Sequence, residues 1–453
     1  MSGFCYIHSV RRADRDLTDR LVEALPDGAT RRIVIKPNWV CHQSDPEFPI
    51  AALVTSTDLI VSIIEACIRR YADLEEILVA DVPIQSCDWL RLVHQAGIER
   101  LVARFGGLAR PRVTVRDLRA SRVRSVKGYL VEEPPSAEHG DPKGFADIVL
   151  DHQSFLEATS DDSASFRVAD YSPEETKSSH RKGFHRYRVA RSLLECDLFI
   201  NAAKMKTHQK AGITGALKNV VGINVNKAYL VHYREGGLSR GDEFPPDIAW
   251  PVVLQSRVRR WALGRSRPVF GVLRTGWRGF RQLYGLETKA TRDRIGRPFV
   301  LTGGSWYGND SIWRMIYDLN RVILHGRPEG GELASEPQRR YLAVVDGITA
   351  GEGNGPLQPL PVEAGIVAIS DNPFLADFAL SRLMGFDAKK IPQLAHHREF
   401  GAKSWGDFDP ASARLHLDGR ELCGIEALAV LRVFLPPAGW REHIELAAAS
   451  RVA

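Results

Sequence analysis

The sequence lacks the segments that mark membrane and secreted proteins. No apolar run approaches the roughly 20 residues that a membrane-spanning helix needs, and the N-terminal stretch MSGFCYIHSVRRADRD does not follow the basic, apolar, small-residue order of a secretory signal. The chain also has no internal repeat and no low-complexity segment. These absences favour a cytoplasmic globular protein.

Cysteine is scarce and dispersed. The 453 residues include six cysteines and no CxxC pair, so their spacing signals neither a zinc site nor an iron-sulfur cluster. Because a free cysteine behaves as a small apolar residue, we expect reduced and mostly buried thiols at Cys5, Cys41, Cys67, Cys87, Cys196 and Cys423.

The familiar catalytic signatures are missing as well. The sequence contains no GxSxG elbow, no HExxH, no kinase signature, no convincing dinucleotide fingerprint and no P-loop. Transferase, lyase, hydrolase and isomerase chemistry therefore all stay open. Any site has to be found from the placement of individual side chains.

What is present is the composition of an ordinary globular protein. With 44% hydrophobic and 26% charged residues, a chain of this length can bury a full core and form two or three packed regions. The formal net charge of +6 suggests an anionic partner, although a moderate excess of this kind is common in soluble proteins.

Strand and helix patterns alternate along the N-terminal third. Apolar, β-branched segments predict strands at 31–39, 75–83 and 110–118, and apolar residues at helical spacing predict helices within 55–76 and 87–107. Such alternation implies right-handed βαβ units. We therefore predict an α/β fold with a mostly parallel or mixed sheet, flanking helices, and polar and basic insertions.

Two interruptions of this rhythm divide the chain into five regions. They are an N-terminal α/β region at 1–119, a polar insertion of hairpins and loops at 120–190, a site-bearing strand and helix at 191–227, a basic insertion at 228–297, and a C-terminal α/β region at 298–453. The last region completes the same domain or forms a second one. In it we expect strands at 298–304 and 339–349, a helix within 309–326, a strand and helix within 365–385, and a final apolar helix or strand at 421–437.

Residues 256–297 of the basic insertion are rich in arginine. Aromatic residues such as Trp261 and Trp277 are interleaved, and Glu287 and Asp293 are the only acids. Arginine with aromatics can bind an anionic membrane surface, an acidic protein or nucleic acid. Nucleic acid is the least favoured partner because no nucleic-acid motif accompanies the segment. A locally packed, solvated insertion is favoured over a surface-binding one.

The leading candidate site lies in residues 197–226, where an apolar run ends in cationic and amide side chains. Open α/β sheets bind ligands at the carboxyl ends of their strands. Lys204 and Lys206 alternate and so share one face of the predicted strand, together with His208. Two ammonium groups beside an imidazole attract phosphate or carboxylate and oppose protonation of the ring, which leaves it usable as a base. The alternative is a solvated basic edge.

The following segment adds Lys218 and Asn219 behind Gly215. Helix-forming residues after this glycine predict a helix whose N-terminus would offer backbone amide donors to an anion. The glycines of this segment would otherwise simply allow tight helix packing.

Polar groups also end the first two predicted strands. Pro37 forces extended geometry on the residue before it, which would hold Lys36 and Asn38 near the carboxyl edge of the sheet. Asp81 ends the next strand, where a carboxylate can bind a metal, act as a base or cap the following loop. The alternative for Lys36 is a solvated side chain, and for Asn38 a turn.

A further pair of carboxylates lies in the C-terminal third. Asp346 ends a predicted strand, and a glycine-rich loop over 346–356 brings Glu352 and Asn354 close behind it. Such a loop can fold over a ligand, or present Asp346 and Glu352 to a hard divalent cation such as Mg²⁺. A plain glycine-rich turn is equally favoured.

Several of these segments together resemble a known family. The motifs are IKPNW at 35–39, TSTDLI at 55–60, VADVP at 79–83, NAAKMKTH at 201–208, TGALKNVVG at 214–222 and VVDGI at 344–348. In this order they resemble the prokaryotic domain-of-unknown-function family 362. The resemblance implies an α/β domain but no particular reaction. Many members of that family carry a ferredoxin-type domain with closely spaced cysteines. No such run occurs here, so no iron-sulfur cluster is expected.

The favoured interpretation is an enzyme of unassigned class that acts on a small phosphate- or carboxylate-bearing molecule. Its substrate-binding residues would be Lys36, Asn38, Lys204, Lys206, Lys218 and Asn219. His208, Asp81 and Asp346 would carry the chemistry, with a metal at Asp346 and Glu352 if one assists. The alternative is a non-catalytic anion-binding or accessory protein, associated with a membrane through the basic insertion.

Overall fold

A computed structural model gives the fold of the chain. The described residues are 3–10, 15–126, 129–133, 139–168, 171, 173–237, 240–248, 253–254, 256–258, 291–292, 298–299, 301–401 and 405–447. Nearly all of the arginine-rich segment 256–297 lies outside them, so its predicted role stays a prediction. Within the described part of the chain, no helix is long and apolar enough to cross a membrane.

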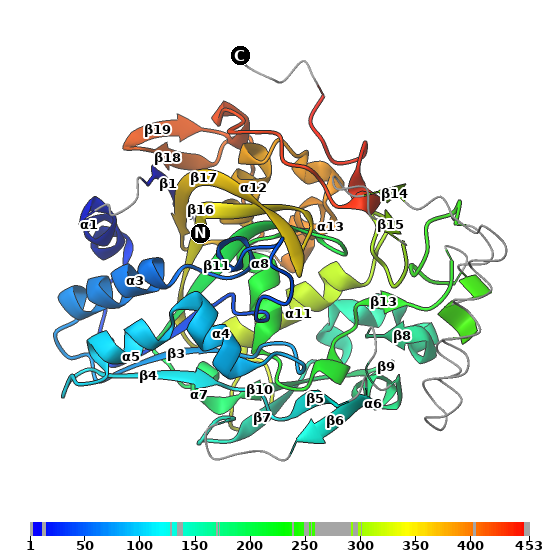
Figure 1. The fold of residues 1–453 in the computed structure, drawn as a ribbon, viewed down its shortest axis with the longest axis horizontal. Coiled ribbons are helices and arrows are strands. Elements are labelled where there is room, and N and C mark those ends of the chain that lie inside the picture. The colour runs from blue at the N-terminus through cyan, green and yellow to red at the C-terminus, as the bar shows by residue number, and fades with distance from the viewer. Residues whose placement is uncertain are drawn as a thin grey trace.

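A ten-stranded mixed sheet forms the centre of the molecule (Figure 1). Its order is β19 (Arg420–Cys423), β18 (Arg414–Leu417), β1 (Cys5–Ser9), β17 (Gln358–Ser370), β16 (Arg340–Asn354), β11 (Leu198–His208), β2 (Arg32–Pro37), β3 (Glu76–Asp81) and β4 (Arg112–Asp117), with β12 (Gly212–Thr214) paired to β11. The neighbours from β16 to β4 all run parallel, whereas β17 is antiparallel to both β16 and β1. The predicted α/β class and mixed sheet are confirmed.

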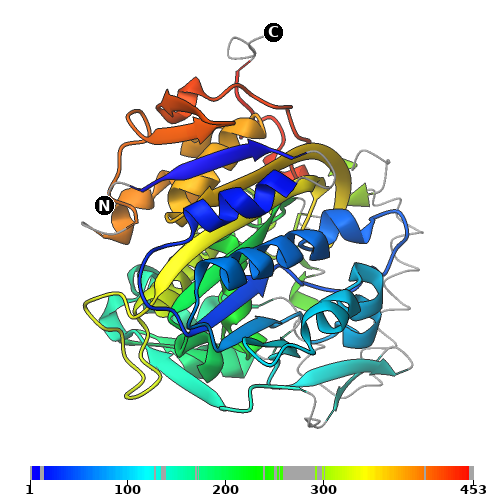
Figure 2. The same ribbon diagram turned by 90° about the vertical axis from the view of Figure 1, so that its left-hand side faces the viewer.

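One face of the sheet is covered by helices from the N-terminal region. They are α1 (Arg15–Ala24), α3 (Thr57–Arg70), α4 (Trp89–Ala96) and α5 (Glu99–Phe105), and Figure 2 shows α1 and α3 side by side over this face. Helix α3 buries Leu59, Ile60, Ile63 and Ile64, which helical spacing puts on one side. The single helix predicted within 87–107 is two helices, because Gly97 ends α4 with a φ of +63°.

The other face packs against helices from later in the chain. These are α8 (Ala216–Asn219), α11 (Ile312–His325), α12 (Pro373–Leu383) and α13 (Pro392–Ala395). Helix α12 begins where the Asn372 side chain accepts hydrogen bonds from the backbone N–H groups of Phe374 and Leu375. Because β-strand side chains alternate between faces, β11 contributes Phe199 to this core and Ile200 to the other.

Residues 122–190 contribute strands to small separate sheets. Strands β5 (Arg122–Val126) and β6 (Tyr129–Glu133) form a hairpin, and β7 (Phe145–Val149), β10 (Phe184–Ala190) and β9 (His180–Arg181) form a three-stranded sheet. Further short elements are α2 (Ile50–Leu53), β8 (Phe166–Arg167), α6 (Pro173–Ser179), α7 (Arg191–Leu194), β13 (Tyr233–Arg234), β14 (Thr291–Arg292) and β15 (Pro298–Phe299).

Three predictions of local structure are wrong. The strand predicted at 298–304 is limited to β15 at Pro298–Phe299, which pairs with β14, and residues 301–304 are not a strand. The glycine-rich segment after Asp346 is not a loop, because β16 continues to Asn354 and pairs with β17 along this stretch. Its small residues allow close packing, and a Cβ at Gly351 would lie 2.7 Å from the Pro359 side chain. Residues 421–437 are not a long helix or strand, and contain only the end of β19 and one short helical turn at Ile425–Ala427.

Candidate anion-binding site

A cavity of about 310 Å³ lies at the carboxyl ends of β2, β3 and β11. This is the edge where parallel strands of an open sheet bind ligands. Its wall contains seven of the predicted site residues, namely Lys36, Asn38, Asp81, Lys206, His208, Lys218 and Asn219. We call it the lysine cavity, because Lys210 and Lys227 line it too, together with His232.

Asp81 is the one carboxylate among the described residues that line the lysine cavity, and it has partners of its own. Its carboxylate lies 2.7 Å from Lys36 Nζ and accepts hydrogen bonds from the backbone N–H groups of Trp39 and Val82. The Lys36 ammonium also donates to the carbonyl of Pro37 at 2.9 Å. The pair therefore ties the ends of β2 and β3 together.

A chain of three amide side chains runs behind this pair. Asn38 Nδ2 donates to Asn219 Oδ1 at 2.7 Å, and Asn219 Nδ2 donates to Asn201 Oδ1 at 2.7 Å. Asn201 in turn donates to the carbonyl of Ala216. These bonds fix α8 against β2 and β11, so that Lys218 on α8 faces the lysine cavity.

Lys206 lies deeper in the wall of the lysine cavity. Lys206 is fully buried, and its Nζ donates to the carbonyl of Leu53 at 2.7 Å. Desolvation lowers the pKa of Lys206 well below its usual value, and the charges of Lys204 and Lys218 lower it further.

Lys218 and Lys227 behave in the same way. Burial lowers the pKa of Lys218 to about 7, with smaller contributions from Lys36 and Lys210. Burial also lowers the pKa of Lys227 to about 7, against an opposing effect of Asp81. Among the described residues, none accepts a hydrogen bond from the Lys218 ammonium, whereas Lys227 donates to the carbonyl of Asn224 at 3.0 Å.

His208 is oriented by the chain that follows it. Its Nδ1 accepts hydrogen bonds from the backbone N–H groups of Lys210 and Ala211 at 3.1 and 3.2 Å. Burial and the charge of Lys218 lower the pKa of His208 well below its usual value, so the ring is neutral. A neutral imidazole that accepts at Nδ1 carries its proton on Nε2. In this state His208 is a hydrogen-bond donor at Nε2.

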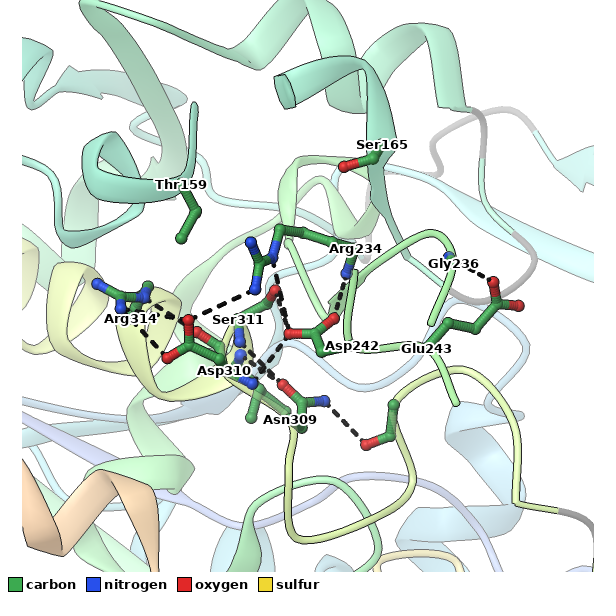
Figure 3. Close-up of polar contacts among 12 residues, drawn as sticks. Thr159, Ser165, Arg234, Gly236, Asp242, Glu243, Asn309, Asp310, Ser311 and Arg314 are labelled. Atoms are coloured by element: carbon green, nitrogen blue, oxygen red, sulfur yellow. Dashed lines mark hydrogen bonds and ion pairs between the residues drawn. The ribbon is translucent and has the colours of Figure 1, made fainter. Parts of the chain in front are cut away.

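A polar network that includes Asn309, Asp242 and Ser311 lies close to the segment of His232, and Figure 3 shows these three side chains together. Asn309 Nδ2 donates to the carbonyl of His232 at 2.9 Å, and Asn309 Oδ1 accepts from the first backbone N–H groups of α11. Beside it, the Asp242 carboxylate accepts from the backbone of Arg234 and from Ser311 Oγ. The network joins the segment that carries His232 to the N-terminal end of α11.

Three buried polar atoms of the lysine cavity have no hydrogen-bond partner among the described residues. They are Asn38 Oδ1, Thr214 Oγ1 and His232 Nδ1, and all three residues line the cavity. Buried polar groups are nearly always hydrogen-bonded in folded proteins, so a partner for these three atoms would have to be an ordered water or a ligand, or come from a rearranged side chain.

Lys204 and Asp346 lie outside the lysine cavity. Lys204 Nζ is 2.9 Å from the Asp346 carboxylate, and both side chains are buried. The same carboxylate accepts from the backbone N–H groups of Ser56 and Ile348. Lys204 forms part of the floor of a larger, open groove of about 1240 Å³ that is bordered by α1, α3 and α5.

Glu352 lies in a third place. Its carboxylate accepts from the backbone N–H of Leu435 at 2.9 Å and lies 3.5 Å from the Arg432 guanidinium. It therefore has different partners from Asp346, and it lines a hollow of about 420 Å³ that Asp346 does not line. The metal site predicted at Asp346 and Glu352 stays a prediction.

The N-terminus of α8 has a protein partner, so the prediction that it binds an anion directly is wrong. The Asp377 carboxylate on α12 accepts from the backbone N–H groups of Ala216 and Leu217 at 2.6 and 3.0 Å. Burial raises the pKa of Asp377 to about 7. A Cβ at Gly215 would lie 2.1 Å from this carboxylate, which explains the glycine.

Sequence reasoning missed three residues of the cavity, namely Lys210, Lys227 and His232. Lys210 is two residues from His208 and could have been included from its position alone. The other two follow the helix and short turns after β12, and no periodic signal in the sequence brings that segment back to the ends of β2 and β3.

Fold and site together describe an α/β protein with a cationic cavity at the strand ends of its sheet. The family model described as a domain of unknown function (DUF362) matches residues 123–382, more than half of the 453 residues. The chain belongs to this family.

Similarity to individual proteins is limited. Over 60 residues the chain is 38% identical to a thylakoid-associated protein of Synechocystis sp., which covers 13% of this chain and 19% of that protein. The crystal structure of a Thermotoga maritima protein matches over 76% of this chain and 52% of the Thermotoga chain, at 12% identity and a TM-score of 0.31. The lactate racemase apoprotein of Thermoanaerobacterium thermosaccharolyticum matches over 51% of this chain and 40% of the racemase chain, at 12% identity and a TM-score of 0.23. These scores are too low to inform the fold or the activity.

Proposed function

We propose that the chain is an enzyme that binds a small phosphate- or carboxylate-bearing molecule in the lysine cavity. One observation carries the proposal. Five lysines and two histidines line a cavity of about 310 Å³, and Asp81, the one carboxylate among its described lining residues, is already paired with Lys36. A cavity of this size suits a small metabolite rather than a macromolecule.

The electrostatics of the cavity favour an anion. Lys206, Lys218 and Lys227 all have lowered pKa values because they are desolvated near other cations. A bound phosphate or carboxylate would offset that repulsion and restore the charged form of the lysines. Anion binding should therefore be coupled to proton uptake at neutral pH.

Catalysis is supported by the same lowered pKa values. A lysine with a pKa of about 7, such as Lys218, is partly unprotonated at neutral pH and can act as a general base or a nucleophile. In this proposal Lys206 and Lys227 hold the anionic group, His208 donates a hydrogen bond from Nε2, and Lys218 moves the proton. Lys36 and Asn38 hold the cavity wall in place through their contacts with Asp81 and Asn219. The proposed location is the cytoplasm, which rests on the sequence alone.

Non-catalytic anion binding is the second candidate. It is favoured by the engagement of two groups that a reaction would use, since Asp81 is paired with Lys36 and His208 Nδ1 accepts two backbone N–H groups. Binding requires only the positive charge, which the cavity supplies in either case.

A thermal-shift screen with inorganic phosphate, phosphorylated metabolites and carboxylates tests the binding, because a ligand of the folded state raises Tm. Lys206→Met should weaken binding of a hit about 10- to 100-fold, as expected for the loss of a charged hydrogen bond of roughly 1.5–3 kcal/mol. The matched control is Lys389→Met, which removes an exposed lysine. Equal shifts in both variants would overturn the proposed site.

Turnover separates the two candidates. The compound with the largest shift is incubated with the protein and followed by NMR. An enzyme converts it, and Lys218→Met should still bind the compound while losing most of the turnover. Binding without any conversion, in wild-type protein, would favour the non-catalytic candidate.

A further inference from the structure

A second cluster of reactive side chains lies behind one wall of the lysine cavity. Cys41, His42 and Cys87 each offer a donor atom, and these three atoms all lie within 4.8 Å of one another. Cys41 and Cys87 are buried at 7% and 5% exposure, whereas His42 is partly exposed. This cluster could not be predicted from local sequence, because the two cysteines are 46 positions apart and belong to no CxxC motif.

The cluster joins the loops that follow β2 and β3. A backbone hydrogen bond from Ile84 to the carbonyl of Val40, at 3.0 Å, holds the two loops together. The guanidinium of Arg119 donates to the carbonyls of Ile84, Gln85 and Cys87 at 2.9 to 3.0 Å. These hydrogen bonds from Arg119 hold the loop that carries Cys87 in place, and a ligand site requires such preorganisation.

The chemistry of the three donors points to a soft or borderline metal ion. Thiolate sulfur and imidazole nitrogen are the ligands that Zn²⁺ prefers, at about 2.3 and 2.0 Å, so donors on one zinc ion lie roughly 3.3–3.8 Å apart. The Cys41 Sγ to His42 Nδ1 distance is already 3.6 Å. An inward movement of about 1 Å at most would bring the whole set to that spacing.

We propose that Cys41, His42 and Cys87 form a site for one thiophilic metal ion such as Zn²⁺, with a fourth position left for water or another ligand. Both thiols lose their protons to solvent when the metal binds, and the two thiolates with a neutral imidazole balance the charge of the divalent ion. His42 Nδ1 exchanges its hydrogen bond from the Asp88 backbone N–H for the metal, or the ring turns to present Nε2. The partly exposed face of His42 gives the ion its entry path.

Such a site would brace the lysine cavity without belonging to it. Val40 and Ile84, the residues that the backbone bond joins, both line that cavity. Metal at Cys41 and Cys87 would cross-link the loops that continue from Lys36 and Asp81. The inference does not depend on the proposed anion, because all three protein donors come from Cys41, His42 and Cys87.

Cobalt substitution tests the site directly. Full-length protein is stripped with a chelator under reducing conditions and titrated with Co²⁺, whose thiolate ligands give a near-ultraviolet charge-transfer band. We expect saturation at one Co²⁺ per chain, displacement by Zn²⁺, and a higher Tm with either ion. Cys41→Ser and Cys87→Ser should each lose most of the band, and Cys423→Ser, at an exposed cysteine, should keep it.

A further variant guards against misfolding of the buried serine variants. His42→Ala alters a partly exposed residue, and it should fold normally while weakening Co²⁺ binding at least tenfold. Absence of the band in wild-type protein, or an unchanged band in the cysteine variants, would overturn the proposal. So would a Cys41–Cys87 disulfide, found by thiol counting, that persists under reducing conditions. The anion thermal shift is a separate measurement, so either proposal can fail alone.

Discussion

Four lysines near the carboxyl edge of the sheet fall into two groups that differ in their partners. Lys36 and Lys204 each contact a buried carboxylate, Asp81 at 2.7 Å and Asp346 at 2.9 Å. Lys206 instead donates to a backbone carbonyl, and the Lys218 ammonium has no acceptor among the described residues. The paired lysines hold the ends of the strands together. The unpaired ones mark where an external anion would be stabilised.

Breaking a paired group should give the largest effect. Lys204→Met leaves the Asp346 carboxylate buried without its cation and should lower the free energy of unfolding by about 3–5 kcal/mol. Urea denaturation followed by circular dichroism measures the change. The double variant Lys204→Met/Asp346→Asn should recover much of the loss. A single variant as stable as wild type would show that the pair contributes little.

A glycine beside the other pair gives the next effect. A Cβ at Gly222 would lie 2.7 Å from Lys36 Nζ and 2.8 Å from Asp81 Oδ1. Gly222→Ala should therefore displace the pair and cost about 1–3 kcal/mol, the usual range for overpacking, with a smaller anion-induced Tm shift. Gly107→Ala is the control, because nothing lies within 4 Å of its Cβ position. Equal melting curves for both variants would contradict the close packing.

Lys218, of the unpaired group, should make the stability of the protein depend on pH. The pKa of Lys218 is about 7 in the folded chain, below its unfolded value, so between pH 7 and 10 the unfolded state binds more protons. Stability from this group therefore rises with pH across that window, by at most about 1.4 kcal/mol per unit. Thermal unfolding of wild type and Lys218→Met is measured from pH 6 to 10 in anion-poor buffer. The difference in stability between the two proteins should show this slope. A flat difference would mean that Lys218 titrates normally.

Much of the fold could be predicted from the sequence, because short apolar, β-branched segments mark most of its strands. The segment predicted at 75–83 is β3, and the one at 110–118 is β4. The antiparallel extension of β16 through 346–354 could not be predicted in this way. Its glycines resemble a loop locally, and only pairing with β17 makes them a strand.

For the site, too, local sequence predicted which residues lie at the strand ends but not how they pair. Polar residues at the ends of strands were found from local sequence, so Lys36, Asp81 and Lys206 were named correctly as neighbours of a sheet edge. Which of them would pair with each other depends on distances between separate strands. The sequence therefore could not show that Asp81 pairs with Lys36 and that Asp346 pairs with Lys204.

The smallest stability effect is expected for Lys206, two residues from Lys204 on the same strand. Lys206→Met removes a desolvated amine, and with it the hydrogen bonds to the carbonyls of Leu53 and Pro356, so that the two effects have opposite signs. The free energy of unfolding without an anion should change by less than about 1 kcal/mol, measured by the same urea titration as Lys204→Met. A loss as large as the one expected for Lys204→Met would show that Lys206 is part of the framework. In that case the division between paired and unpaired lysines would no longer locate the ligand.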